Sequence, residues 1–457
     1  MKLNLQTKRA ITAYPVRVIC ISFAFVILVG TLLLTLPISS RNGLFTPIDN
    51  AFFTATSATC VTGLVVYDTF AHWSTFGQVV ILLLIQIGGL GLVTFTSFFN
   101  VLIRKKIGLR SMQLAQESIN STSIIDIQRI VKRVVIASFM IEFAGALVLS
   151  GVFIPKYGLD GIFISIFLAV SAFCNAGFDI LGREGPYVSL CHYNSNAVVM
   201  ITIALLIIIG GLGFAVWNDL YDFRRTKKLQ LHTKVVLGAT AGLIIIGMVA
   251  FLALEWKNPM TLYGMSTKDK FLAGFFQSVS TRTAGFNSVN LNNLNDLTKL
   301  VFIFLMFIGA APGSTGGGVK VTTVAVLIMT VISVVRGRQS TVVLGKRVPK
   351  QTVYKALSVV FLGAVTVCIA AGATYFIMGP KVIHDGIDAL FEACSAFATV
   401  GLSVGVTARI TLIPKLILSL TMFIGRVGPV SLMFALAMSN NSRTRKQVVP
   451  EGKIMVG

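Results

Sequence analysis

The sequence predicts an all-α integral membrane protein of four span-pore-span repeats, with eight transmembrane helices and four re-entrant pore helices around one pseudo-fourfold pore. Three observations predict this fold class: the composition, the number of long apolar runs, and a short glycine motif that occurs four times. Of the 457 residues, 55% are hydrophobic and 12% are charged, whereas about 25% of the residues in an average soluble domain are charged. We therefore expect the chain to lie in a lipid bilayer.

Eight apolar runs are long enough to cross a hydrocarbon core, which takes about 20 helical residues. They are 15–37, 76–103, 134–154, 196–217, 235–254, 300–334, 356–378 and 412–438. Basic clusters follow the even-numbered runs, at 104–110, 224–228, 336–338 with 345–347, and 443–446. By the positive-inside rule these clusters and both termini face the cytoplasm. The formal charge of +22 is then explained by membrane topology rather than by nucleic-acid binding.

Several other classes of protein find little support in the residues. The first apolar run is long enough to remain in the bilayer, so no removable signal peptide is expected. The six cysteines form no C-x-x-C pair and the four histidines have no ligand spacing, which argues against a disulfide framework and a zinc site. A membrane-embedded enzyme is the alternative from another class. It is disfavoured because Glu142, Glu255 and Glu392 do not cluster in sequence with a histidine or with each other.

The repeat is visible after each odd-numbered run, where a short apolar stretch ends in a glycine motif. The four stretches are FFTATSATCVTGL (52–64), IFLAVSAFCNAGF (166–178), GFFQSVSTRTAGF (274–286) and LFEACSAFATVGL (390–402). A phenylalanine stands ten residues before each glycine. Four units follow: 1–133, 134–234, 235–355 and 356–457, with filter loops at 54–64, 171–178, 279–286 and 395–402.

These stretches are too short to cross a bilayer and are interpreted as re-entrant half-helices. Irregular backbone at membrane depth is tolerated only where it is buried in protein or lines a watery cavity. Four loops around one axis can therefore present backbone carbonyls to a dehydrated cation. An external loop with a capping glycine explains one stretch, but not four in register. The expected filter residues are Cys60, Val61, Thr62, Gly63, Cys174, Asn175, Ala176, Gly177, Arg282, Thr283, Ala284, Gly285, Ala398, Thr399, Val400 and Gly401.

The sixth apolar run is interrupted by GAAPGSTGGGVK (309–320), in which proline and five glycines disfavour a continuous helix. A phosphate-binding loop is excluded because Val319 separates Gly318 from Lys320, and because no strand precedes the segment. In the fourth repeat Arg426 takes the place of Gly89 and Gly211 within an apolar run. An arginine at that depth is a functional-site hypothesis by default.

The fourfold plan, the single glycine per loop, STRTAGF in the third repeat and the glycine-rich break after it resemble the Trk/Ktr/HKT superfamily of potassium transporters. With no extra pair of leading spans, the match is closest to the Ktr-type membrane subunit. The resemblance implies channel-like translocation of potassium. A sodium-dependent or sodium-permeable transporter of the same architecture is the alternative. Potassium is favoured because all four filter glycines are present, whereas serine at the first accompanies sodium preference in the plant branch.

The resemblance also implies a gate and several partners. The gate is an intramembrane loop beneath the filter, here Gly313, Ser314, Thr315, Gly316, Gly317, Gly318 and Lys320, with Arg426 in the pore beside it. The chain itself has no nucleotide site. The resemblance implies a homodimer on which a cytoplasmic ring of nucleotide-binding regulatory subunits docks. The basic segments 104–133, 224–234, 336–350 and 443–446 are expected to face that ring and anionic membrane lipid.

Overall fold

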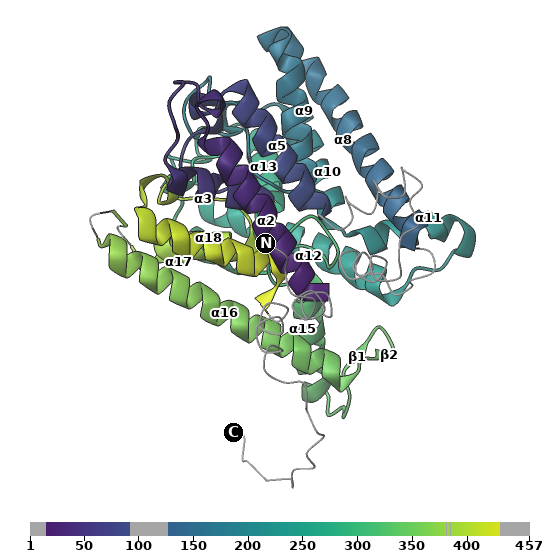
Figure 1. Cartoon of the computed structure of the whole chain (residues 1–457). Coiled ribbons are helices and arrows are strands. Elements are labelled where there is room, and N and C mark those ends of the chain that lie inside the picture. The colour runs from purple at the N-terminus through teal and green to yellow at the C-terminus, as the bar shows by residue number, and fades with distance from the viewer. Residues whose placement is uncertain (1–14, 92–126, 381, 384, 430–457) are drawn as a thin grey trace, which may run out of the picture.

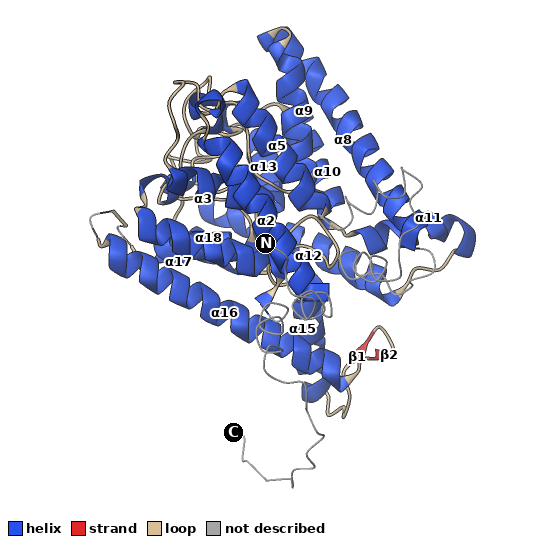
Figure 2. Ribbon diagram, in the orientation of Figure 1, coloured by secondary structure: helices blue, strands red, loops and turns tan. Residues whose placement is uncertain are grey.

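The computed structural model describes residues 15–91, 127–380, 382–383 and 385–429 of the chain. Within these ranges the fold is helical apart from one two-stranded hairpin (Figure 2). The helices and the hairpin strands follow one another along the chain. They are α2 (Pro15–Thr35), α3 (Ile48–Thr59), α4 (Thr69–His72), α5 (Thr75–Leu90), α8 (Ile127–Tyr157), α9 (Asp160–Phe173), α10 (Ala197–Gly211), α11 (Phe214–Thr226), α12 (Leu231–Glu255), α13 (Thr267–Ser280), α14 (Asp296–Phe307), α15 (Val321–Val335), β1 (Val342–Val343), β2 (Lys346–Arg347), α16 (Lys350–Met378), α17 (Gly386–Ala398) and α18 (Leu412–Val427).

Four helices are long and apolar enough to cross a bilayer: α2, α8, α12 and α16. They coincide with the odd-numbered apolar runs of the sequence. Their outward faces carry large apolar side chains that water would not tolerate in such number, for example Phe143, which is 70% exposed, and Phe376, which is 88% exposed. The expected all-helical membrane fold is confirmed.

Each long helix is followed by a short one that packs against it: α3 on α2, α9 on α8, α13 on α12 and α17 on α16 (Figure 1). These four helices have 12 to 14 residues, which is too few to cross a bilayer. They are largely buried, and the phenylalanine that begins the motif is fully enclosed at Phe53, Phe167 and Phe391. The short helices therefore form the centre of the molecule, surrounded by the long ones.

Breaks that were not predicted interrupt the runs 76–103, 196–217 and 412–438. Helix α5 ends at Leu90 and α18 at Val427, and a residue with positive φ follows both, Gly91 (+79°) and Gly428 (+94°). The run 196–217 is divided into α10 and α11, which are bent by 93°. Glycine permits these left-handed turns, and a helix cannot continue through them. The remainders of the runs 76–103 and 412–438, and the clusters 104–110 and 443–446, lie largely outside the described residues.

The even-numbered run of the third repeat is also interrupted, but the segment between its two helices is longer. Helix α14 ends at Phe307, and α15 begins only at Val321. The expected interruption of the sixth run is confirmed, and the long loop between the two helices is called the break loop here (308–320).

Close packing of helix on helix fixes the positions of the short helices. A methyl group on Gly88, Gly210 or Gly425 would overlap the carbonyl oxygen of the residue at the end of a short helix, which is Thr59, Phe173 or Phe397 respectively. The same glycine of the IGG or IGR motif therefore performs the same task in three repeats. Only glycine allows the even-numbered helices to come this close.

Two ion pairs join neighbouring repeats at the opposite ends of these helices. The ammonium of Lys299 on α14 lies 2.9 Å from Asp388 of α17, and that of Lys415 on α18 lies 2.7 Å from Asp49 of α3. Both lysine side chains are about one-tenth exposed, at 8% and 11%. Breaking such a pair leaves an uncompensated charge. The pairs therefore tie the third repeat to the fourth and the fourth to the first.

Replacement of Gly425 by alanine should lower the stability of the folded protein by about 1–3 kcal/mol, because the new methyl group overlaps the Phe397 carbonyl. Gly372 of α16 has open space around its Cα, so Gly372→Ala is the matched control and should leave stability unchanged or slightly raised. Thermal unfolding of the purified variants measures both. Equal midpoints for Gly425→Ala and Gly372→Ala would contradict the packing argument.

Candidate functional site

The four motif glycines meet in a closed ring. A methyl group on Gly63 would strike the carbonyl oxygen of Ala176, and one on Gly401 would strike that of Thr62. A methyl group on Gly177 would lie 2.8 Å from the oxygen of Ala284, and one on Gly285 would lie 2.6 Å from that of Val400. Each loop thus touches the next around one axis. The structure brings all four loops together in chain order.

The backbone of the four loops has one unusual conformation. The residue two positions before each glycine has a positive φ, at Val61 (57°), Asn175 (59°), Thr283 (65°) and Thr399 (50°), and so do the glycines themselves, at 70° to 91°. Left-handed backbone is strained in β-branched residues and persists only where the surroundings impose it. Its alternation with ordinary backbone turns successive amide groups to one side of the chain and the carbonyls to the other.

The hydrogen bonds show which side is which. Seven of the eight amide hydrogens at the two positions before the glycines, all except that of Thr283, are donated to carbonyls of the short helix behind the loop. Examples are Thr62 to Ser57 at 2.8 Å and Val400 to Ser395 at 2.8 Å. Within the described residues, no protein donor reaches the matching carbonyl oxygens. These belong to Val61, Thr62, Asn175, Ala176, Thr283, Ala284, Thr399 and Val400, all of which are fully buried.

Eight buried carbonyls without a donor are far from ordinary, because almost every buried backbone group in a folded protein is paired. Carbonyl oxygen is a hard ligand, and rings of it replace the water shell of a dehydrated cation. The residues present therefore fit a monovalent cation as cargo. No cluster of histidine, cysteine or carboxylate side chains suited to a resident metal occurs among the described residues.

The other expected filter residues lie at the inner ends of the loops. Cys60 and Cys174 cap α3 and α9, and Ala398 ends α17. Arg282 differs from its counterparts, because its carbonyl accepts a hydrogen bond from Nδ2 of Asn175 at 3.2 Å. Its buried guanidinium donates to the Gly309 carbonyl at 3.0 Å. Arg282 therefore links a filter loop to the start of the break loop.

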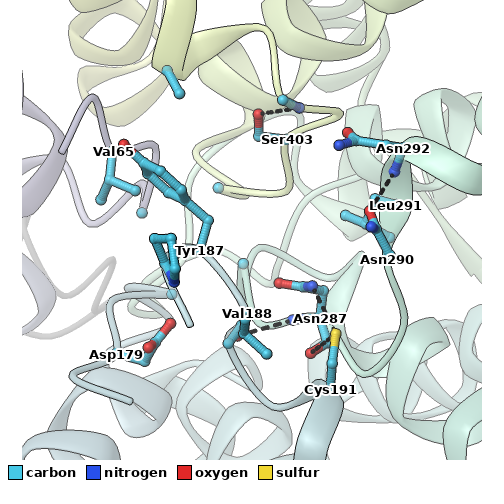
Figure 3. A pocket seen from close by; sticks show the side chains of 18 of the residues that line it. Val65, Asp179, Tyr187, Val188, Cys191, Asn287, Asn290, Leu291, Asn292 and Ser403 are labelled. Atoms are coloured by element: carbon cyan, nitrogen blue, oxygen red, sulfur yellow. Dashed lines mark hydrogen bonds between the residues drawn. The ribbon is translucent and has the colours of Figure 1, made fainter. Parts of the chain in front are cut away.

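On one side of the ring a cavity of about 520 Å³ opens, lined by all four glycines and by the loops that follow them. Figure 3 shows the labelled side chains Asp179, Tyr187, Asn287 and Ser403 around it. Burial, with the nearby charge of Asp68 adding to it, raises the pKa of Asp179 to about 7. The carboxylate of Asp179 is the acidic group on the cavity wall, which otherwise carries His192 and Arg409.

On the other side of the ring lies the break loop, which contacts three of the four filter loops or their helices. The amide of Gly317 donates to Oγ1 of Thr399 at 3.0 Å. The Thr315 hydroxyl lies 3.2 Å from Oδ1 of Asn175 and 3.3 Å from the Phe173 carbonyl. Gly316 packs so closely on Thr283 that a methyl group there would overlap its hydroxyl. The expected gate residues are thus brought directly beneath the expected filter residues.

Two cations hold the carbonyls of this loop. Arg426 donates through Nη1 to the Thr315 carbonyl and through Nη2 to that of Gly88. Lys320 donates from Nζ to the carbonyls of Gly316 at 2.6 Å and Gly317 at 3.2 Å. Three successive loop carbonyls therefore face fixed positive charges. The sequence placed both residues in the gate, but the contact between them and the same short segment is a finding of the structure.

The sequence analysis missed a buried polar group behind the second filter loop. The carboxylate of Glu142 on α8 accepts from Nε2 of Gln86 on α5 at 3.0 and 3.2 Å, and Sγ of Cys174 lies 3.9 Å from it. Glu142 is 4% exposed and Gln86 8%. Both residues were visible as polar residues inside apolar runs, but their separation of 56 residues gave no sign that they meet.

Re-entrant half-helices that bring unpaired carbonyls to one axis define a class of membrane protein, namely those that pass dehydrated cations. A family model described as TrkH, cation transport protein, matches residues 15–445. The chain therefore belongs to the TrkH family of cation transport proteins, which is not a family of enzymes.

Two relatives and one solved structure are similar to the chain over most of its length. The chain is 40% identical to the Ktr system potassium uptake protein B of Bacillus subtilis, with 97% of each chain covered. It is 38% identical to the potassium/sodium uptake protein NtpJ of Enterococcus hirae, again with 97% of each covered. The crystal structure of the potassium transporter TrkH from Vibrio parahaemolyticus superposes with a TM-score of 0.66 at 18% identity. It covers 92% of this chain and 85% of that one, which supports the fold.

Replacement of Glu142 by leucine should destabilise the protein by about 1–3 kcal/mol, because the buried amide of Gln86 then loses its acceptor. Glu142→Gln keeps an acceptor oxygen and should stay close to the parent. Phe143→Leu, on the exposed face of the same helix, is the control for changes in the span itself. Thermal unfolding of the four proteins gives the order, and a leucine variant as stable as the glutamine variant would contradict it.

Proposed function

We propose that this protein is the potassium-translocating membrane subunit of a potassium uptake system and that it conducts in a channel-like manner through the ring of four loops. The observation that carries the proposal is the set of eight buried carbonyl oxygens, two from each loop, that no described donor reaches. A potassium ion on the axis would satisfy them. The names of the Bacillus subtilis and Vibrio parahaemolyticus relatives agree with potassium.

Sodium is the second candidate cation, either as a permeant ion or as a coupled one. The name of the Enterococcus hirae relative, a potassium/sodium uptake protein, supports it. The glycine in all four loops favours potassium as the main cargo, because no side chain at these positions narrows the carbonyl ring or forms hydrogen bonds within it.

We propose that the break loop is the gate. Its backbone lies below the ring, and Arg426 and Lys320 hold its carbonyls in place. Two positive charges at this point oppose the passage of a cation, and the opposition is strong because water is scarce there. Opening requires that these contacts be exchanged for water or for the moving ion, and the glycines of the loop give its backbone the freedom to move.

The remaining proposals concern assembly and orientation. The chain is a multi-pass protein of the cell membrane, with its basic ends and both termini in the cytoplasm. It works as a homodimer, and a ring of nucleotide-binding regulatory subunits docks on the cytoplasmic face. Basic side chains at 224–234 and 336–350 support a contact with an acidic protein surface or with anionic lipid.

Replacement of Gly63 by serine should reduce the discrimination of potassium over sodium on the order of tenfold, the effect of about 1.4 kcal/mol of differential binding. The physical reason is that the new Cβ strikes the Ala176 carbonyl and distorts the ring. Gly43 also has a positive φ but lies in open space, so Gly43→Ser is the matched control. Ion flux into liposomes with potassium, rubidium, sodium and lithium measures the ratio. Unchanged selectivity in a folded Gly63→Ser protein would count against the filter.

Removal of Gly316 and Gly317 from the break loop should raise basal rubidium flux several-fold, because the obstruction and its cation contacts are lost together. Arg426→Ala should also raise flux, with the selectivity of the filter retained. Arg336 lies at the exposed end of α15, and Arg336→Ala is the control for removal of a charge. If the shortened protein remains folded and its flux equals that of the parent, the loop is a structural kink and the gate lies elsewhere.

A further inference from the structure

A groove outside the ion pathway separates the first turns of α12 and α16 from α15 and the hairpin. Its volume is about 370 Å³. Figure 1 shows α15, the start of α16 and the strands β1 and β2 together, at the end of the molecule opposite the turn between α8 and α9. The side chains that line it are largely apolar, and they include Leu231, Val235, Val326, Val343, Val348, Ala356 and Val359.

Local hydrogen bonds hold the groove open. The break loop displaces α15 from α14, and the hairpin then folds back over the end of α15. Thr341 is tied to Thr330 by their hydroxyls at 3.0 Å, and the amide of Val342 donates to Oγ of Ser333 at 3.2 Å. Val343 is only 5% exposed as a result. The groove is therefore a feature of the fold and does not require the movement of an element.

Five of the side chains that line the groove are polar. They are His232, Thr322, Thr323, Thr352 and Lys355. The side chain of Lys355 is exposed and, within the described residues, makes no ion pair or hydrogen bond. Nearby Asp219 is 6% exposed and already accepts from the Gln230 amide at 2.9 Å. Lys355, the lysine on the wall of the groove, therefore has no anionic partner among the described residues.

The charge pattern of the surrounding chain has one sign. No aspartate or glutamate occurs between residues 297 and 384 or between residues 223 and 254, the two stretches from which the whole groove is built. Six basic residues lie between 336 and 355: Arg336, Arg338, Lys346, Arg347, Lys350 and Lys355. A groove that combines apolar walls with an exposed lysine, in a strongly basic part of the chain, is complementary to a molecule with an apolar tail and an anionic head.

We infer that this groove binds one anionic phospholipid of the cytoplasmic leaflet, with an acyl chain along Val326 and Val359 and the phosphate at Lys355 and His232. The inference deepens the proposed contact with anionic lipid and rests on the proposed orientation of the basic end toward the cytoplasm. The neighbouring surfaces support lipid over a soluble partner. Val334 and Val335 of α15 and Phe361 of α16 are widely exposed, and a bilayer covers such side chains at no cost.

The consequence for function follows from the position of α15. The lipid would contact α15 and α16 together, and α15 begins directly after the break loop at Val321. Occupancy of the groove would therefore fix the angle at which α15 leaves the loop that carries Gly316 and Lys320. Anionic lipid would stabilise one setting of the loop, and its removal would change the flux without a change in selectivity.

The test uses the full-length protein in detergent micelles, titrated with phosphatidylglycerol or with phosphatidylcholine of the same acyl chains, and native mass spectrometry to measure retained lipid. The parent should retain one phosphatidylglycerol in preference to phosphatidylcholine. Lys355→Glu should weaken phosphatidylglycerol about fivefold or more, whereas Lys346→Glu, on the hairpin but outside the groove, should have a smaller effect. Val359→Trp should weaken both lipids, and Leu357→Trp on the exposed face should not.

Three results would overturn the inference: equal retention of the two lipids by the parent, equal effects of Lys355→Glu and Lys346→Glu, or a loss of dimer in Val359→Trp with lipid retention unchanged. The last would assign the groove to a second copy of the chain. Rubidium flux into liposomes with and without phosphatidylglycerol separates this inference from the proposed function. Selective flux without a lipid effect removes the proposed influence of the lipid on the break loop, whereas specific lipid retention without any flux removes only the proposed transport function.

Discussion

The structure depends on one constraint, which is that backbone carbonyls at membrane depth need a polar partner. Eight of them lie around the ring formed by Gly63, Gly177, Gly285 and Gly401, and seven of the eight amide groups of the same residues donate to the short helices behind. The protein keeps these oxygens in place with strained backbone at Val61 and its equivalents. Such strain is retained only where the surrounding packing outweighs it, so the whole arrangement of helices serves to hold the ring.

Glycine makes that packing possible at two levels. In the ring it removes the Cβ that would strike the neighbouring loop. In the even-numbered helices Gly88, Gly210 and Gly425 let each helix approach the end of a short helix. The third repeat departs from the pattern, because the space is filled there by the break loop, where a methyl group on Gly309 would meet the Gly317 carbonyl. Among the described residues, only the third repeat inserts a long loop at its break, between α14 and α15.

Buried backbone carbonyls occur at two levels along the axis, in the ring and in the break loop, and they are satisfied differently at each level. The ring leaves its carbonyls free, whereas the carbonyls of Thr315, Gly316 and Gly317 are occupied by Arg426 and Lys320. In the proposed gate, basic side chains stand where a mobile cation would pass, so the path would be closed by occupancy as much as by bulk. The Asn175 side chain connects the two levels, since it contacts both Thr283 and Thr315. A movement of the break loop would therefore alter the contacts of the second filter loop, to which Asn175 belongs.

The sequence by itself determined the membrane fold, the four short helices and the residues of the ring. The length of an apolar run and a motif repeated at regular spacing can both be read directly along the chain, without knowledge of which residues are in contact. It also located the break at 308–320 and the singular Arg426. Tertiary structure alone decided the rest. The breaks after Leu90, Gly211 and Val427 were missed, since a glycine inside an apolar run is compatible with a helix until the neighbouring chain requires a turn. The pairing of Gln86 with Glu142, the clamp of Lys320 on its own loop and the groove beside Lys355 depend on contacts between side chains. Spacing along the chain does not encode such contacts, because the close packing of several helices creates them.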